Sequence, residues 1–206
     1  MSTETFDRRA ANLQRGRVLE YLTIGWNILE GLIAVGSGLL AGSIALVGFG
    51  LDSFIESFSG GALLWRLRSD QDAERREAIA LRLVGISFLA LAAYVAFDAV
   101  KALVMRETPE ASYVGIGLAA LSLVVMPVLA RSKRILAAEL NSRALKADSR
   151  QTDLCAYLSA ILLVGLLLNA VAGWWWADPV AGLIMTPIIV REGIQALRGE
   201  ACDDCH

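Results

Sequence analysis

Two acidic side chains lie four residues apart in a segment that is otherwise uncharged. Asp52 and Glu56 occur within GFGLDSFIESFSGG. An ionisable group at bilayer depth costs about 2.5–3.5 kcal/mol even on a lenient insertion scale, so its presence there requires a reason. Residues four apart on a helix project from one face, about one turn from each other. The pair therefore predicts a site in which two hard oxygen ligands hold one divalent cation.

A structural role for the same pair is the competing interpretation. The two carboxylates could form ion pairs with arginines or lie at a solvated helix end. The nearest arginine further along the segment is Arg66. At 1.5 Å per residue it lies about 15 Å beyond Glu56, too far for an ion pair. We therefore favour the cation site.

A second polar segment, ADSRQTDLCAY, supplies further candidate ligands. Gln151 and Cys155 are again four apart, and facing the carboxylate pair they would complete a four-ligand, roughly tetrahedral site for Zn²⁺ or another borderline-soft ion. Taken alone, Cys155 is more typical of a small buried hydrophobic side chain than of a ligand, and only its spacing from Gln151 brings the two interpretations level. Asp148 is a further candidate ligand, expected at the solvated mouth of the site, whereas Asp153 is expected to face elsewhere.

Three more ionisable groups fall in apolar stretches. Asp98 and Lys101 are three apart, so pairing between them within one helix is the favoured interpretation. Glu30 follows Asn27 by one helical turn. These two side chains, and Asp98 as a third candidate, could line a proton path or hold helices together, and the sequence does not distinguish the two roles.

The last residues, ACDDCH, form a short tail at 201–206 after a domain at 1–200. Cys202, Cys205 and His206 are possible metal ligands there. A single CxxC without a second pair of ligands is only weak evidence for a metal site. Three cysteines in all do not predict a disulfide framework.

The composition indicates a membrane protein. Of 206 residues, 56% are hydrophobic and 19% charged, whereas soluble domains are about 45–50% apolar and about 25% charged. Six spans of about 20 residues use about 120 positions, which leaves no room for a separate soluble domain. The formal net charge of −2 provides no basic field for nucleic acid.

The apolar runs predict an all-α, polytopic fold with six transmembrane helices and a glycine-rich turn after the first helix. The expected ranges are about 18–36, 43–65, 79–104, 113–130, 146–174 and 179–196. The two loops after the second and fourth helices look helical and amphipathic.

The basic residues predict the orientation. Assigned to alternating sides of six helices, 17 of the 19 Lys and Arg residues fall on the side that holds both termini. By the positive-inside rule that side is the cytoplasm. We expect a multi-pass protein of the cell (inner) membrane.

These motifs resemble the transmembrane domain of the cation diffusion facilitator (cation efflux) family. DSFIE, with Asp52 and Glu56, is similar to the acidic motif of the family's second helix. ALKADSRQTDLC is similar to its second ligand motif, with Gln151 and Cys155 where the family places His or Asp. The family usually carries a cytoplasmic metal-binding domain after helix 6, and here only REGIQALRGEACDDCH follows.

The resemblance implies a function. It implies export of a divalent metal, Zn²⁺ first and Cd²⁺ or another thiophilic ion next, by proton antiport through a homodimer in the bilayer. No other cofactor is implied.

Two alternatives follow from the residues themselves. One is a non-transporting metal sensor or scaffold whose buried acids only hold helices together. The other is an intramembrane hydrolase, which is disfavoured because HExxH and GxGD motifs are absent and no predicted helix contains a histidine. We therefore expect no enzymatic activity.

Overall fold

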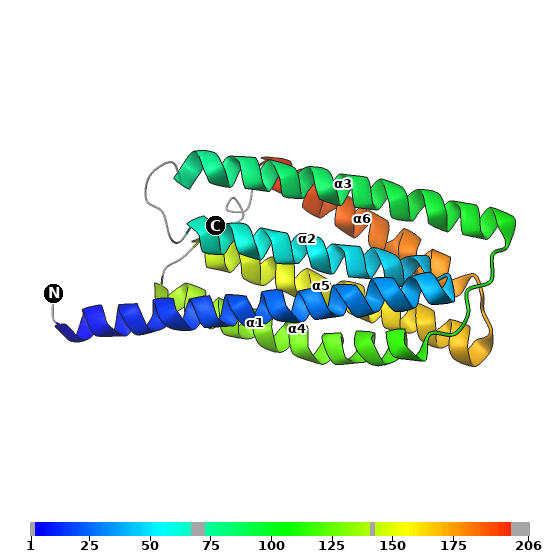
Figure 1. Ribbon diagram of the computed structural model, residues 1–206, viewed down its shortest axis with the longest axis horizontal. Helices are drawn as coiled ribbons and strands as arrows, with labels where there is room; N and C mark the ends of the chain where they lie inside the picture. The colour runs from blue at the N-terminus through cyan, green and yellow to red at the C-terminus, as the bar shows by residue number, and fades with distance from the viewer. Residues whose placement is uncertain (1–2, 67–72, 141–142, 199–206) are drawn as a thin grey trace.

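The computed structural model describes residues 3–66, 73–140 and 143–198, and every regular element in these ranges is an α-helix. The side-by-side helices form an elongated bundle (Figure 1). The prediction of an all-α fold with six helices is confirmed. The six helices are α1 (Thr3–Ala41), α2 (Ile44–Arg66), α3 (Ala73–Met105), α4 (Tyr113–Leu140), α5 (Arg143–Ala172) and α6 (Ala177–Arg198). The predicted tail ligands Cys202, Cys205 and His206 lie outside the described residues.

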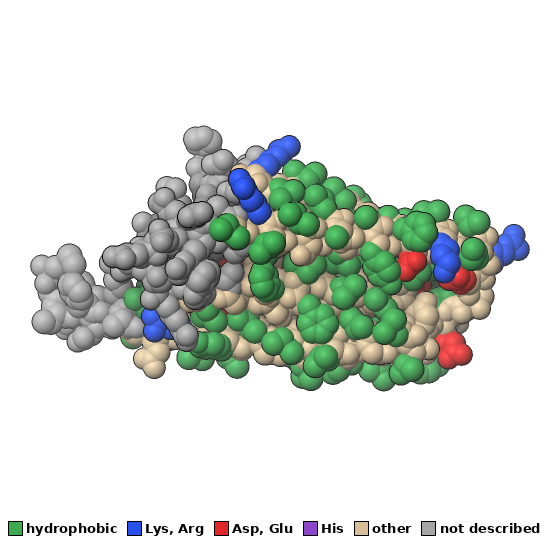
Figure 2. Space-filling model, turned by 45° about the horizontal axis from the view of Figure 1, so that its top comes forward, with side chains coloured by type: hydrophobic (Ala, Val, Ile, Leu, Met, Phe, Trp, Pro, Cys, Tyr) green, Lys and Arg blue, Asp and Glu red, His purple; other side chains and the backbone are tan. Residues whose placement is uncertain are grey.

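The surface of the bundle suits a bilayer. Five helices, all except α2, contain a segment long and apolar enough to cross a membrane. Helix α2 is as long as a span and carries two carboxylates within an otherwise largely apolar sequence. Hydrophobic side chains cover most of the described face in Figure 2, and charged side chains gather toward its ends. These features confirm the prediction of a multi-pass membrane protein.

Helices α1, α4 and α3 differ most from their predicted ranges. The amphipathic segments expected in loops continue the spans as helix, so α3 begins at Ala73, α4 extends to Leu140 and α5 begins at Arg143. Helix α1 also continues through Ser37 and Gly38, which we expected in the turn. Gly38 instead allows a close approach, because a Cβ there would lie 2.9 Å from the Val47 backbone nitrogen. The chain turns only at Gly42, where φ is +65°.

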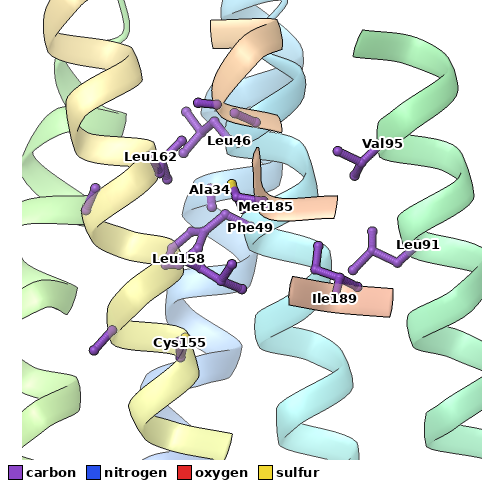
Figure 3. Close-up of a cluster of buried hydrophobic side chains, with 14 of the residues drawn as sticks. Ala34, Leu46, Phe49, Leu91, Val95, Cys155, Leu158, Leu162, Met185 and Ile189 are labelled. Carbon is purple, nitrogen blue, oxygen red and sulfur yellow. The ribbon is translucent and has the colours of Figure 1, made fainter. Parts of the chain in front are cut away.

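Helix α2 lies among the other helices. It packs along α1 and also contacts α3, α5 and α6, while α4 packs along α5 and α3 along α6. Buried apolar side chains from these helices meet around α2 (Figure 3). The cluster includes Ala34, Leu46, Phe49, Leu91, Val95, Leu158, Leu162, Met185 and Ile189. The arrangement buries residues 45–50 together with Asp52, Ser53, Glu56 and Ser57, whereas Phe58 stays exposed.

The N-termini of α2 and α6 are joined at the end of the bundle that carries the connections at 42–43 and 173–176. Ser43 Oγ accepts a hydrogen bond from Leu46 N at 3.2 Å and so caps α2. Asp178, in the first turn of α6, accepts hydrogen bonds from Ser43 Oγ at 2.5 Å and from Ile44 N at 3.0 Å. One buried carboxylate therefore satisfies donors that the start of α2 would otherwise leave unpaired.

We predict that Asp178→Ala lowers the free energy of unfolding by about 1–3 kcal/mol, because it leaves buried donors without an acceptor. Thermal unfolding of the purified protein in detergent measures the loss. Glu107→Gln is the control, since Glu107 forms an exposed ion pair with Lys101 and such pairs contribute about 0–1 kcal/mol. Equal effects of the two substitutions would contradict the proposed cap.

Candidate cation site

Asp52 and Glu56 project from the same face of α2 into the protein interior. Only 6% of Asp52 and 4% of Glu56 is exposed. Both side chains line a pocket together with Gln151 of α5 and Glu192 of α6. The remaining lining is apolar and comprises Phe88, Leu154, Leu158, Ile188 and Ile189. The pocket thus combines four oxygen-bearing side chains with hydrophobic walls.

The two carboxylates differ in their partners. Glu56 Oε1 accepts a hydrogen bond from Thr152 Oγ1 at 3.0 Å, while Glu56 Oε2 has no hydrogen-bond partner. Asp52 receives neither a hydrogen bond nor an ion pair from any residue that the structure describes. A buried carboxylate without a partner is costly unless a cation or a proton neutralises it. The pocket face of α2 is therefore suited to a positively charged ligand.

Gln151 lies at the same pocket, as the spacing of the second motif predicted. Its Oε1 accepts a hydrogen bond from Ser59 Oγ of α2 at 3.2 Å. This contact orients the amide toward α2 and leaves one oxygen lone pair free, because a carbonyl oxygen can accept two hydrogen bonds.

Cys155 lies deeper in the bundle and is 1% exposed. Its thiol faces the carboxyl groups of Glu30 and Glu56, and its sulfur is 4.0 Å from Glu30 Oε2. It is not among the residues that line the pocket. Within the described residues, no three His, Cys, Asp or Glu side chains are arranged to hold a metal ion. The predicted donors are thus neighbours, and binding of one ion by all of them requires their side chains to move.

Glu30 connects α1 to α2. Its Oε2 accepts a hydrogen bond from Ser53 Oγ at 3.0 Å, and its Oε1 lacks a partner. Asn27 is fully buried, and neither polar atom of its amide is hydrogen-bonded. Through its contact with Ser53, Glu30 links α1 to α2. A proton path through Glu30 and Asn27 stays a prediction.

A buried ion-pair network adjoins Glu56. Lys133 of α4 is fully buried, and its Nζ lies 3.1 Å from Glu20 Oε2 and 2.5 Å from Asp148 Oδ2. The same ammonium donates a hydrogen bond to Thr152 Oγ1 at 3.4 Å. Because Thr152 in turn contacts Glu56, one lysine connects α1, α4 and α5 to the edge of the site.

The network corrects two predictions. The sequence interpretation placed Lys133 in a cytoplasmic loop, but α4 continues past it and buries it. Asp148 was expected at a solvated mouth, yet it is 8% exposed and paired with Lys133. The sequence did contain a sign of this buried polar network. The polar residues at 20, 23, 27 and 30 recur three or four apart, a spacing that predicts one polar face, and this face is the buried side of α1.

The predicted pairing of Asp98 with Lys101 is wrong. Lys101 Nζ instead forms an ion pair with Glu107 Oε1 at 3.2 Å, where both side chains are exposed. Asp98 interacts with Tyr94, one turn earlier on α3. Snorkelling toward the helix end allows the lysine to reach the loop carboxylate. Asp153 faces away from the site, as expected, and pairs with Arg134.

The fold and the site define a class of protein. A membrane-spanning helical bundle with partly unpaired carboxylates at a pocket is typical of proteins that move cations across membranes. Residues 22–200 match the cation efflux transmembrane domain. The chain belongs to this family of cation transporters, which confirms the resemblance inferred from the two motifs.

Three proteins are similar to this chain, and two of them are described as transporters. An uncharacterized transporter of Methanocaldococcus jannaschii, MJ0449, is 29% identical over 82% of this chain and 63% of its own length. Transmembrane protein 163 of Xenopus laevis is 25% identical over 95% of this chain and 71% of its own. An uncharacterized transporter of Synechocystis, sll1263, is 27% identical over 86% of this chain and 60% of its own. The chain thus spans less than two thirds of the length of two of these relatives.

We predict that Lys133→Met lowers the free energy of unfolding by about 3–5 kcal/mol, because it leaves Glu20 and Asp148 buried without their cation. The measurement is chemical or thermal unfolding in detergent. Lys101→Met is the matched control, since its ion pair is exposed, and it is expected to have little effect. If the two variants unfold alike, Lys133 does not hold the three helices together.

Proposed function

We propose that this protein exports a divalent transition-metal cation from the cytoplasm in exchange for protons, with Zn²⁺ as the preferred ion. One observation carries the proposal: Asp52 is buried at a pocket and has no partner among the described residues. A divalent cation supplies the missing charge, and Glu56 and Gln151 are present at the same pocket to share it.

The donor types support a transition metal. Asp52 and Glu56 supply hard oxygens, Gln151 adds a neutral oxygen, and Cys155 supplies a soft sulfur near Glu56 and Glu30. A thiolate favours Zn²⁺ or Cd²⁺ over Mg²⁺ and Ca²⁺. The thiol and both carboxyl groups must be deprotonated to bind metal, so binding releases protons and protonation releases metal. Competition at the same atoms is the physical basis of the proposed antiport.

The orientation and assembly form part of the proposal. The excess of Lys and Arg on the side of the termini supports a cytoplasmic location for that side in the cell (inner) membrane. Close packing at glycines, such as Gly31 of α1 against Gly50 of α2, allows helices to slide during alternating access. By likeness to the family, the working unit is a homodimer. The tail ligands Cys202, Cys205 and His206 would capture metal near the cytoplasmic entrance.

A non-transporting sensor or scaffold is the second candidate. The contacts of Glu30 with Ser53 and of Lys133 with Glu20 and Asp148 favour it, since buried acids do connect helices here. These contacts do not include Asp52. The two functions differ in one property, because a sensor binds metal without carrying it across a sealed membrane.

We predict that Asp52→Asn combined with Glu56→Gln abolishes Zn²⁺ flux, because both charged ligands are lost while the side-chain shapes are kept. The assay reconstitutes the full chain in vesicles and follows Zn²⁺ uptake driven by a pH gradient. Glu139→Gln, which removes an exposed carboxylate from α4, is expected to transport as the parent does. Flux that persists in the double variant would refute the proposed function, and binding without flux in the parent would favour the sensor.

We predict that Cys155→Ser changes metal preference more than overall activity. Replacing a thiol with a hydroxyl removes the soft donor, so Cd²⁺ flux is expected to fall by about tenfold relative to Mn²⁺ flux. Parallel uptake assays with the two ions in the same vesicles give the ratio. An unchanged ratio would remove Cys155 from the proposed ligands and leave it as a packing residue.

A further inference from the structure

Glu192 of α6 is a carboxylate whose position only the structure reveals. The sequence places it beside Arg191, near the end of the predicted helix at 179–196. In the structure Glu192 is half-buried and lines the same pocket as Asp52, Glu56 and Gln151. It thus joins the candidate cation site from a third helix.

The packing of α6 directs Glu192 into the pocket. Ile188 and Ile189, which precede Glu192 by about one turn, line the pocket on the same face of α6. The next residue, Gly193, lies directly against α3, where a Cβ would be 3.1 Å from the Gly85 carbonyl oxygen. A close backbone contact at the adjacent residue fixes the rotation of α6 and therefore the side to which Glu192 projects.

The charges at the pocket are unbalanced. Asp52 and Glu192 lie close enough to repel each other. Neither forms an ion pair with any residue that the structure describes, and no lysine or arginine lines the pocket. Asp52 is more than nine-tenths buried and unpartnered. Like charges brought together in a low-dielectric pocket are stabilised when a cation lies between them.

We propose that Glu192 is a direct ligand of the cation in this pocket and adds a third carboxylate to the oxygen donors Asp52, Glu56 and Gln151. The inference rests on the proposed function and assigns a donor that the two sequence motifs do not contain. Cys155 does not line the pocket. No three of these acidic or thiol side chains are arranged to hold a metal within the described residues, so the carboxylates and the thiol converge on the ion only when their side chains move. The oxygen donors by themselves bind Mn²⁺ as well as Zn²⁺, because they do not select thiophilic ions, and the preference for Zn²⁺ comes from the Cys155 thiolate.

Titration calorimetry of the purified full chain with Mn²⁺ and with Zn²⁺ tests the proposal. Changes to groups that merely support metal ligands cost about 10–100-fold in affinity. Loss of a direct ligand in Glu192→Gln is therefore expected to weaken binding of both ions by at least about tenfold. Glu192→Asp keeps the carboxylate and is expected to restore part of the affinity. Glu139→Gln and Arg191→Gln are the charge controls, and both are expected to bind metal as the parent does.

The outcomes separate this inference from the proposed function. Glu192→Gln that binds both ions like the parent would overturn the ligand assignment, even if Asp52→Asn and Glu56→Gln abolish binding. If Glu192→Gln and Glu139→Gln weaken binding equally, and the effect vanishes at high salt, Glu192 acts only through long-range attraction, and the assignment fails again. Metal binding and flux that survive loss of both Asp52 and Glu56 charges would refute the proposed function itself.

Discussion

The cost of burying negative charge governs this bundle. Among the described residues, six carboxylates are buried, whereas Lys133 is the one buried cation. The six are Glu20, Glu30, Asp52, Glu56, Asp148 and Asp178. In a low-dielectric interior, each of these groups requires a hydrogen bond, a counter-charge or a proton. How each requirement is met separates the structural acids from the acid that is left available for a ligand.

Most of these acids connect helices. Asp178 holds the start of α2 to the start of α6, Glu20 and Asp148 share Lys133 between α1, α4 and α5, and Glu30 accepts a hydrogen bond from Ser53. Glu56 belongs to both groups, because one of its oxygens is held through Thr152 and the other is unpaired. Asp52 alone among the six has no partner within the described part of the chain. The site is thus the place where the charge balance of the bundle is incomplete.

The central position of α2 follows from the same constraint. A helix that carries two carboxylates, several serines and several glycines is poorly suited to face lipid on all sides. Surrounded by α1, α3, α5 and α6, it exposes little of its polar surface and places the carboxylate pair beside α5 and α6. The glycines contribute directly, since Gly31, Gly38 and Gly50 allow α1 and α2 to approach at backbone distance. The apolar cluster around Phe49 then fixes the depth of the pair.

The sequence alone determined the number and type of helices, because long apolar runs can cross a membrane only as helices. It also determined that Asp52 and Glu56 share a face, since a spacing of four residues has that consequence in any helix. Spacing likewise placed Gln151 correctly at the pocket. The sequence could not show that Lys133 is buried, that Lys101 pairs with Glu107, or that Glu192 joins the pocket. These facts depend on which helix faces lie together, and that choice is made by packing between helices far apart in the chain.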